Sequence, residues 1–159
     1  PQILVLMVAC LVVGWHFTWA GLAALVLGVL ILVTFAMAMA LFFSAWNVFF
    51  RDFQNIVATI TPFLHFMVPM MYPFSLVYSA HESNPILYQI YMANPVAQSV
   101  ILMQQFFWYP LVEDPSKLGV EYPPDMWVRG GITLAICLVL LHFAQKFFAR
   151  CEGKFPELL

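Results

Sequence analysis

The chain has 159 residues, of which 64% are hydrophobic and 17% aromatic, while only 9% are charged. Soluble domains carry about 25% charged residues, and a soluble fold of this size could not bury so much apolar surface. The formal net charge of −2 gives no basic field of the kind that nucleic-acid binding requires. The composition therefore predicts an all-α integral membrane protein and excludes a nucleic-acid-binding one.

The N-terminal part predicts two membrane crossings, because the first charged residue is Arg51 and one crossing needs about 20 helical residues. The first predicted span, residues 2–17, ends in aromatic residues typical of a membrane surface. The second span covers residues 20–50. This span has three small residues on one face. Either another helix packs closely against this face, or the face points to lipid. The three residues are Gly21, Ala24 and Gly28.

A third span is predicted over residues 56–78, which contain three prolines. Each proline removes a backbone donor and disturbs the turn before it, so this helix should be kinked or unwound. Freed carbonyls at membrane depth must be satisfied by protein or by a water-filled cavity. The stretch from Pro69 to Pro73 is therefore predicted to line a cavity.

Residues 86–109 lie in a long uncharged segment that Asn94 and Pro95 divide into two pieces. Neither piece is long enough to cross the membrane comfortably. We expect two short helices, over residues 86–93 and 96–109, that enter the membrane and return on the same side.

The distribution of basic residues favours this re-entrant arrangement. A re-entrant pair puts four of the 6 basic residues on one side and two on the other, whereas a full crossing would divide them equally. The positive-inside rule then places the side with four, and the C-terminus, in the cytoplasm. The four are Arg51, Lys146, Arg150 and Lys154, and the two are Lys117 and Arg129.

The remaining residues predict an acidic, proline-rich external loop over 110–126, a last span over 127–148 and a cytoplasmic tail over 149–159. The predicted fold thus has four transmembrane helices and a pair of short re-entrant helices on the extracytoplasmic side, all in one transmembrane domain.

Catalytic and metal-binding patterns are missing from the sequence. The four histidines and three cysteines have no metal-site spacing, and no Walker A, GxSxG or GxGxxG motif occurs. We therefore expect no catalytic, cofactor-binding or metal-binding residues. Aromatic residues at helical spacing near the end of the second span could stack on sugar rings or face lipid as interfacial aromatics commonly do. They include Phe42, Trp46 and Phe49.

Three motifs, in this order and spacing, together with the chain ending, are similar to the C-terminal two-thirds of an ABC-2 type permease from the O-antigen and teichoic acid export branch. They are AWNVFFRDFQNI at 45–56, PMMYPF at 69–74, Asn-Pro at 94–95 and the ending GKFPELL at 153–159. One departure concerns the helix after Asn-Pro, where family members often carry an arginine and this chain has none. Contacts of that helix with an anionic substrate are therefore in doubt.

The resemblance implies a six-span subunit whose N-terminal part precedes this chain. It implies a homodimer that binds two copies of a separate nucleotide-binding ATPase, which holds ATP and Mg. The predicted contacts with the ATPase are Asn47, Arg51, Asp52 and Phe53. The predicted outer gate consists of Pro69, Tyr72, Pro73, Asn94 and Pro95.

The expected function is that of a permease subunit, not an enzyme, in an ATP-driven exporter in the bacterial cytoplasmic membrane. Its substrate would be a lipid-linked polysaccharide of the O-antigen, teichoic acid or galactan type. The alternatives are an ABC-2 exporter of a drug or small lipid and a membrane-embedded glycolipid enzyme. All eight acidic residues fall at predicted surfaces, which disfavours the enzyme.

Overall fold

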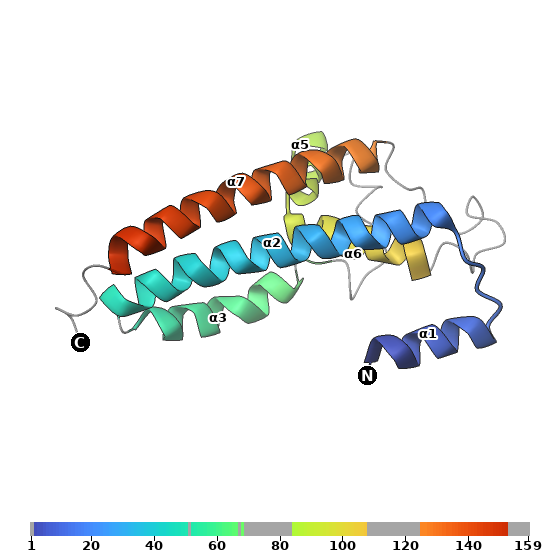
Figure 1. Ribbon diagram of the computed structural model, residues 1–159, viewed down its shortest axis with the longest axis horizontal. Coiled ribbons are helices and arrows are strands. Elements are labelled where there is room, and N and C mark those ends of the chain that lie inside the picture. The colour runs from blue at the N-terminus through green and yellow to red at the C-terminus, as the bar shows by residue number, and fades with distance from the viewer. Residues whose placement is uncertain (1, 51, 67, 69–83, 108–124, 153–159) are drawn as a thin grey trace.

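All regular structure in the described residues is helical, as the composition predicts. The computed structural model describes residues 2–50, 52–66, 68, 84–107 and 125–152. Figure 1 shows α2 at the centre, with α7 along it and α1 set apart from this pair. The helices are α1 (Gln2–Val12), α2 (Trp19–Phe49), α3 (Phe53–Phe66), α5 (Pro85–Met92), α6 (Pro95–Phe107) and α7 (Met126–Glu152).

The central helix α2 begins and ends where the backbone becomes extended. Thr18 is extended, and its Oγ1 accepts a hydrogen bond from the Gly21 amide at 3.3 Å, which satisfies one of the donors that a helix start leaves free. The backbone is extended again at Phe50. No proline or charged residue interrupts the 31 residues between these points, so α2 is about 46 Å long.

Helix α7 lies along α2 and runs in the same direction. Near the start of α7, Gly130 faces the side chain of Leu27. Near its end, the rings of Phe147 and Phe42 have centroids 5.2 Å apart. The chain between α2 and α7 must therefore return to the end of the pair at which α2 began, and α3 starts this return beside α2 (Figure 1).

Small buried residues at intervals of seven form the contact between α2 and α7. A seven-residue repeat keeps the same stripe of a helix against its neighbour when the two helices cross at a shallow left-handed angle. Because most of these side chains are small, the backbones can approach closely. The repeat comprises Ala24, Ile31, Ala38 and Ala45 on α2, and Gly130, Cys137, Ala144 and Cys151 on α7.

Helix α6 packs antiparallel on the N-terminal half of α2. Gly21 faces the ring of Phe106, and Gly28 faces the backbone of Ser99 and the side chain of Leu102. The Trp15 indole, in the segment before α2, donates a 2.9 Å hydrogen bond to the Phe106 carbonyl. The small face predicted on α2 thus does admit a neighbouring helix, and its lipid-facing alternative is wrong.

The short helices α5 and α6 both contact the half of the α2 and α7 pair at which these two helices begin. Gln89 of α5 reaches Arg129 near the start of α7, and the end of α6 lies beside Trp15. The turn between α5 and α6 approaches Phe35, near the middle of α2. Helix α6 therefore runs from near the middle of α2 back to its start, and Gln89 holds α5 beside α7.

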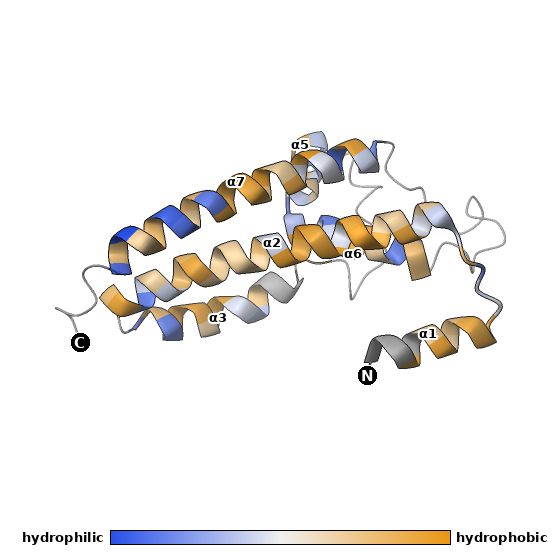
Figure 2. Ribbon diagram, viewed as in Figure 1, coloured by the Kyte–Doolittle hydropathy of each residue, from blue (hydrophilic) through white to orange (hydrophobic). Residues whose placement is uncertain are grey.

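Hydrophobic residues make up most of α2 (Figure 2), and many large apolar side chains of the helices are exposed. Two helices in the described residues, α2 and α7, are long and apolar enough to cross a membrane, and 17% of the most apolar stretch of each is buried. A core helix of a soluble protein would be mostly buried, so this exposure fits a membrane environment. The exposed residues include Val12, Val33, Phe63 and Phe143.

The other predicted spans differ from the observed helices. Helix α1 ends at Val12 rather than at residue 17, because Gly14 adopts a left-handed conformation with φ 95°. Helix α3 starts at Phe53 and is described to Phe66, and residues 67 and 69–83 lie outside the described residues. At 11 and 14 residues, α1 and α3 are shorter than the 17–25 residues of a usual crossing. Four crossings therefore remain a prediction, and the external loop predicted over 110–126 lies outside the described residues up to residue 124.

Candidate functional site

The turn between α2 and α3 carries the predicted ATPase contacts. Its backbone is ordered by hydrogen bonds from the Phe53 amide to the Phe50 carbonyl, at 3.0 Å, and from the Asn55 amide to the Asp52 carbonyl, at 3.1 Å. Asn47 and Asp52 are exposed, so their polar groups are available to another protein. Arg51 lies outside the described residues.

An aromatic cluster joins this turn to α7. It continues from Phe147 through Phe42 and Trp46 to Phe53, with centroid separations of 5.2, 5.8 and 5.6 Å. The structure thus brings Phe53, predicted as an ATPase contact, together with two of the predicted glycan-path residues. The cluster comprises Phe42, Phe43, Trp46, Phe50, Phe53 and Phe147.

The role of Phe147 in this cluster was not predicted from the sequence, since helical spacing within α2 and α3 gives no information about which ring α7 contributes. Phe42, Trp46 and Phe49 keep more than a third of their surface exposed. Both alternatives from the sequence, stacking on sugar rings and facing lipid, require such exposure.

Asn94 and Pro95, two of the predicted gate residues, form the turn between α5 and α6. The Asn94 side-chain oxygen accepts a hydrogen bond from the Val96 amide at 3.0 Å, and its carbonyl accepts one from the Gln98 amide at 3.1 Å. Asn94 therefore acts as the N-cap of α6, and Pro95 occupies the first helical position, where no amide donor is needed. Pro69, Tyr72 and Pro73 lie outside the described residues.

A cavity of about 600 Å³ lies beside this turn, between α5, α6 and the N-terminal half of α7. We call it the turn cavity. Arg129 donates a 3.0 Å hydrogen bond to the side-chain oxygen of Gln89 at one side of it. Gln98, which is 3% exposed, lines another side, and Thr133 contributes a hydroxyl. The cavity thus combines apolar walls with a few polar groups, as ligand-binding cavities do.

Gln98 is the least expected group in the turn cavity. Its side-chain nitrogen donates a hydrogen bond to the Met92 carbonyl, which fixes the orientation of the amide. Its side-chain oxygen is buried and has no hydrogen-bond partner among the described residues, and leaving a buried acceptor unpaired costs about 1–3 kcal/mol. A glutamine amid apolar residues was the available signal for this site, but the sequence alone did not identify the cavity.

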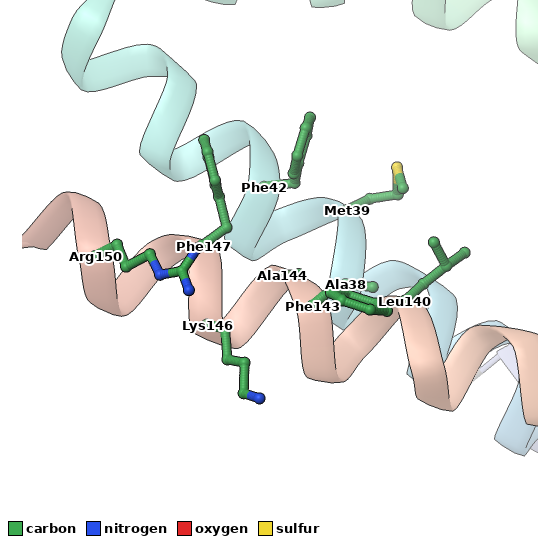
Figure 3. A pocket seen from close by; sticks show the side chains of 9 residues that line it. All are labelled: Ala38, Met39, Phe42, Leu140, Phe143, Ala144, Lys146, Phe147 and Arg150. Atoms are coloured by element: carbon green, nitrogen blue, oxygen red, sulfur yellow. The ribbon is translucent and has the colours of Figure 1, made fainter.

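A second cavity, of about 510 Å³, lies at the other end of the α2 and α7 pair (Figure 3). We call it the basic groove, because Lys146 and Arg150 of α7 stand at its edge. Its floor contains the buried residues Ala38 and Ala144. Large side chains flank these alanines, so a groove opens between the two helices.

In the part of the chain that the structure describes, no three His, Cys, Asp or Glu side chains are grouped so that they could hold a metal ion. The three cysteines are buried and free. His142 is exposed and makes an edge contact with Phe143 at 6.3 Å. The described part of the site consists of exposed surfaces, cavities and aromatic contacts.

A known protein is similar to this chain over most of the chain's length. Over 129 residues, which are 81% of the chain, it is 27% identical to a Myxococcus xanthus protein named O-antigen export system permease protein RfbA. The chain resembles an export permease. It spans 44% of the length of that relative. No family model matches the chain, and no solved structure matches it either.

The resemblance to this permease agrees with the exposed apolar helices. Helices α2 and α7 have the length and composition for a crossing, and the relative is named as a permease, which is a transport protein. These two independent observations together indicate a membrane protein.

Proposed function

We propose that this chain is part of the permease of a polysaccharide exporter in the bacterial cytoplasmic membrane. The observation that carries the proposal is the 27% identity, over 81% of the chain, to a protein named as an O-antigen export permease. The motifs at 45–56 and 94–95 support the same assignment, because both fall at turns between helices where a transporter can contact a partner or open a path.

In this proposal the chain crosses the membrane four times, and α2 and α7 cross in the same direction. The parallel packing of these two helices supports that topology. Lys146 and Arg150 lie at the end of the pair where α2 ends, which the positive-inside rule assigns to the cytoplasm. Helices α5 and α6 then enter from the outside and return to it.

The proposed energy source is ATP hydrolysis on a separate subunit that also binds Mg. Two copies of this ATPase would bind a homodimer of the permease through Asn47, Arg51, Asp52 and Phe53. The aromatic cluster supports such a role, because Phe53 at the turn is connected through Trp46 and Phe42 to α7. A displacement of the turn would therefore be transmitted to two long helices.

The proposed substrate is a lipid-linked polysaccharide. Its sugar rings would pass the exposed rings of Phe42, Trp46 and Phe49. The outer gate would consist of Pro69, Tyr72, Pro73, Asn94 and Pro95. A turn at the end of a short helix suits a gate, since α5 has only 8 residues and, unlike α6, packs little against the long pair, so it can move without disturbing that pair.

The proposal is tested by deleting the gene and by purifying the full-length protein from its native membrane. Deletion should abolish the surface polysaccharide, and the purified protein should carry a Walker-motif ATPase. Intact surface polysaccharide together with new sensitivity to small toxic compounds would instead identify a drug exporter. Recovery of the protein without any ATPase would contradict an ATP-driven permease.

A further inference from the structure

The basic groove has the form of a lipid-binding site. Its floor is shallow because Ala38 and Ala144 let α2 and α7 approach closely. Its walls are apolar and come from both helices, as Figure 3 shows. These walls are formed by Met39, Phe42, Leu140, Phe143 and Phe147.

Two positive charges stand at one end of this apolar surface. Lys146 and Arg150 lie one helical turn apart on α7 and are both exposed (Figure 3). Neither has an acidic partner among the residues that the structure describes. Lysine and arginine at a membrane surface extend their charged groups to the headgroup layer while their aliphatic stems stay on apolar surface. No described acidic residue therefore competes with an anion bound by this pair at headgroup depth.

The geometry points to a binding site for an anionic phospholipid of the cytoplasmic leaflet. One acyl chain lies in the groove between Phe42 and Phe143, and the phosphate lies between Lys146 and Arg150. A guanidinium and an ammonium group together suit phosphate oxygens. The inference rests on the membrane orientation given under the proposed function, but not on export itself.

The positive charge at the groove favours an anionic phospholipid over the other molecules that could fill an apolar groove, which are an apolar helix and a zwitterionic lipid. An apolar helix from the remainder of the protein would fill the groove without using two cations. A zwitterionic lipid brings an ammonium group that Lys146 and Arg150 would repel. Basic residues near the membrane surface attract anionic lipids specifically, with an effect that adds with each residue.

The test measures which lipid stays with the full-length protein. The protein is placed in nanodiscs of equimolar phosphatidylglycerol and phosphatidylethanolamine, extracted with mild detergent and examined by native mass spectrometry. The wild type should retain phosphatidylglycerol preferentially. The double variant Lys146→Gln/Arg150→Gln should lose this preference by roughly tenfold or more, while the charge-preserving swap Lys146→Arg/Arg150→Lys should keep it.

A second variant tests the apolar half of the site. Leu140 is 40% exposed at the groove wall. A tryptophan at this position can therefore fill the groove without entering the buried contact between α2 and α7. The Leu140→Trp protein should retain less phosphatidylglycerol and less phosphatidylethanolamine than the wild type. Its melting temperature should match that of the wild type.

The inference would be overturned by an undiminished phosphatidylglycerol preference in the double variant, or by wild-type protein that retains no lipid. It would also be overturned if polyprenyl phosphate displaced phosphatidylglycerol at equal concentration, because the groove would then serve a carrier lipid. None of these measurements requires the ATPase or the glycan. A failed export proposal therefore leaves the lipid test intact, and the reverse also holds.

Discussion

At the scale of single residues, Gly28 shows how one position sets the distance between two helices. A Cβ atom at Gly28 would stand 3.0 Å from the Ser99 carbonyl oxygen and 3.2 Å from Leu102 Cβ. Both neighbours are held by the backbone of α6, so neither can move aside without moving the helix. The sequence predicted a small face on α2, but its spacing could not identify a helix about seventy residues away as the partner.

Replacing Gly28 with leucine should separate α6 from α2. Overpacking of this kind typically costs about 1–3 kcal/mol, so the melting temperature of the detergent-solubilised protein should fall clearly. Gly131→Leu is the matched control, because no atom of the described residues lies within 4 Å of a Cβ at that position. If Gly28→Leu and Gly131→Leu lowered the melting temperature equally, α6 would not pack on α2 in the native protein.

Gln98 allows a second test at this scale. Gln98→Met removes both the donor to the Met92 carbonyl and the unpartnered side-chain oxygen. Losing the hydrogen bond lowers stability, whereas removing the buried, unpaired oxygen raises it. The free energy of unfolding should therefore change by less than about 1 kcal/mol. Leu102→Ala, at a fully buried position of the same helix, should cost about 2–5 kcal/mol. If thermal unfolding finds Gln98→Met equally damaging, the oxygen has a partner in the membrane.

At the scale of elements, most helix positions followed from the sequence, whereas several helix ends did not. The predicted spans 20–50 and 127–148 agree closely with α2 and with the start of α7. Helix α7 continues to Glu152 because a helix need not stop where the apolar region does. In the proposed topology Lys146 and Arg150 mark the membrane surface, and the helix ends further on, at Glu152.

Contacts between elements were the part of the site that the sequence could not supply. The hydrogen bond between Gln89 and Arg129 joins residues 40 positions apart. The contact between Phe42 and Phe147 joins two different helices. Local periodicity decides which face of a helix is small or aromatic, but the choice of partner depends on the packing of the whole chain. The turn cavity and the basic groove were missed for this reason.

The turn between α2 and α3 supports a prediction about coupling. Asp52→Asn and Phe53→Ala should reduce export about tenfold or more, because each weakens the proposed link between the ATPase and α2, and coupling energies are typically 1–3 kcal/mol. ATP hydrolysis by the complex and the amount of permease in the membrane should stay near the wild-type values. Surface polysaccharide and phosphate release are the measurements.

Thr59→Val is the control for these coupling variants. Thr59 is exposed on α3, and its hydroxyl donates only to the Asn55 carbonyl one turn earlier, at 2.8 Å. Export should therefore be unaffected by this substitution. Normal export by Asp52→Asn and Phe53→Ala would remove the assignment of the turn as the ATPase contact.

At the scale of the whole molecule, the direction of each helix constrains the topology. Helices α2 and α7 are parallel, and α6 is antiparallel to α2. Helix α5 has 8 residues and α6 has 13, so they are about 12 and 20 Å long, and neither spans the roughly 30 Å hydrocarbon core. Two such helices joined by the tight turn at Asn94 and Pro95 are most simply inserted from one side.

Cysteine accessibility in intact cells tests this topology directly. In a variant without Cys10, Cys137 and Cys151, single cysteines are placed at Asn84 before α5 and at Trp127 near the start of α7, both exposed. A membrane-impermeant maleimide added to intact cells should label both positions, because a re-entrant hairpin begins and ends outside. Labelling of only one of them would mean that the segment between them crosses the membrane, and would also remove the charge argument for a cytoplasmic C-terminus. A cysteine at Glu152 is the internal control, since it should react only after the cells are opened.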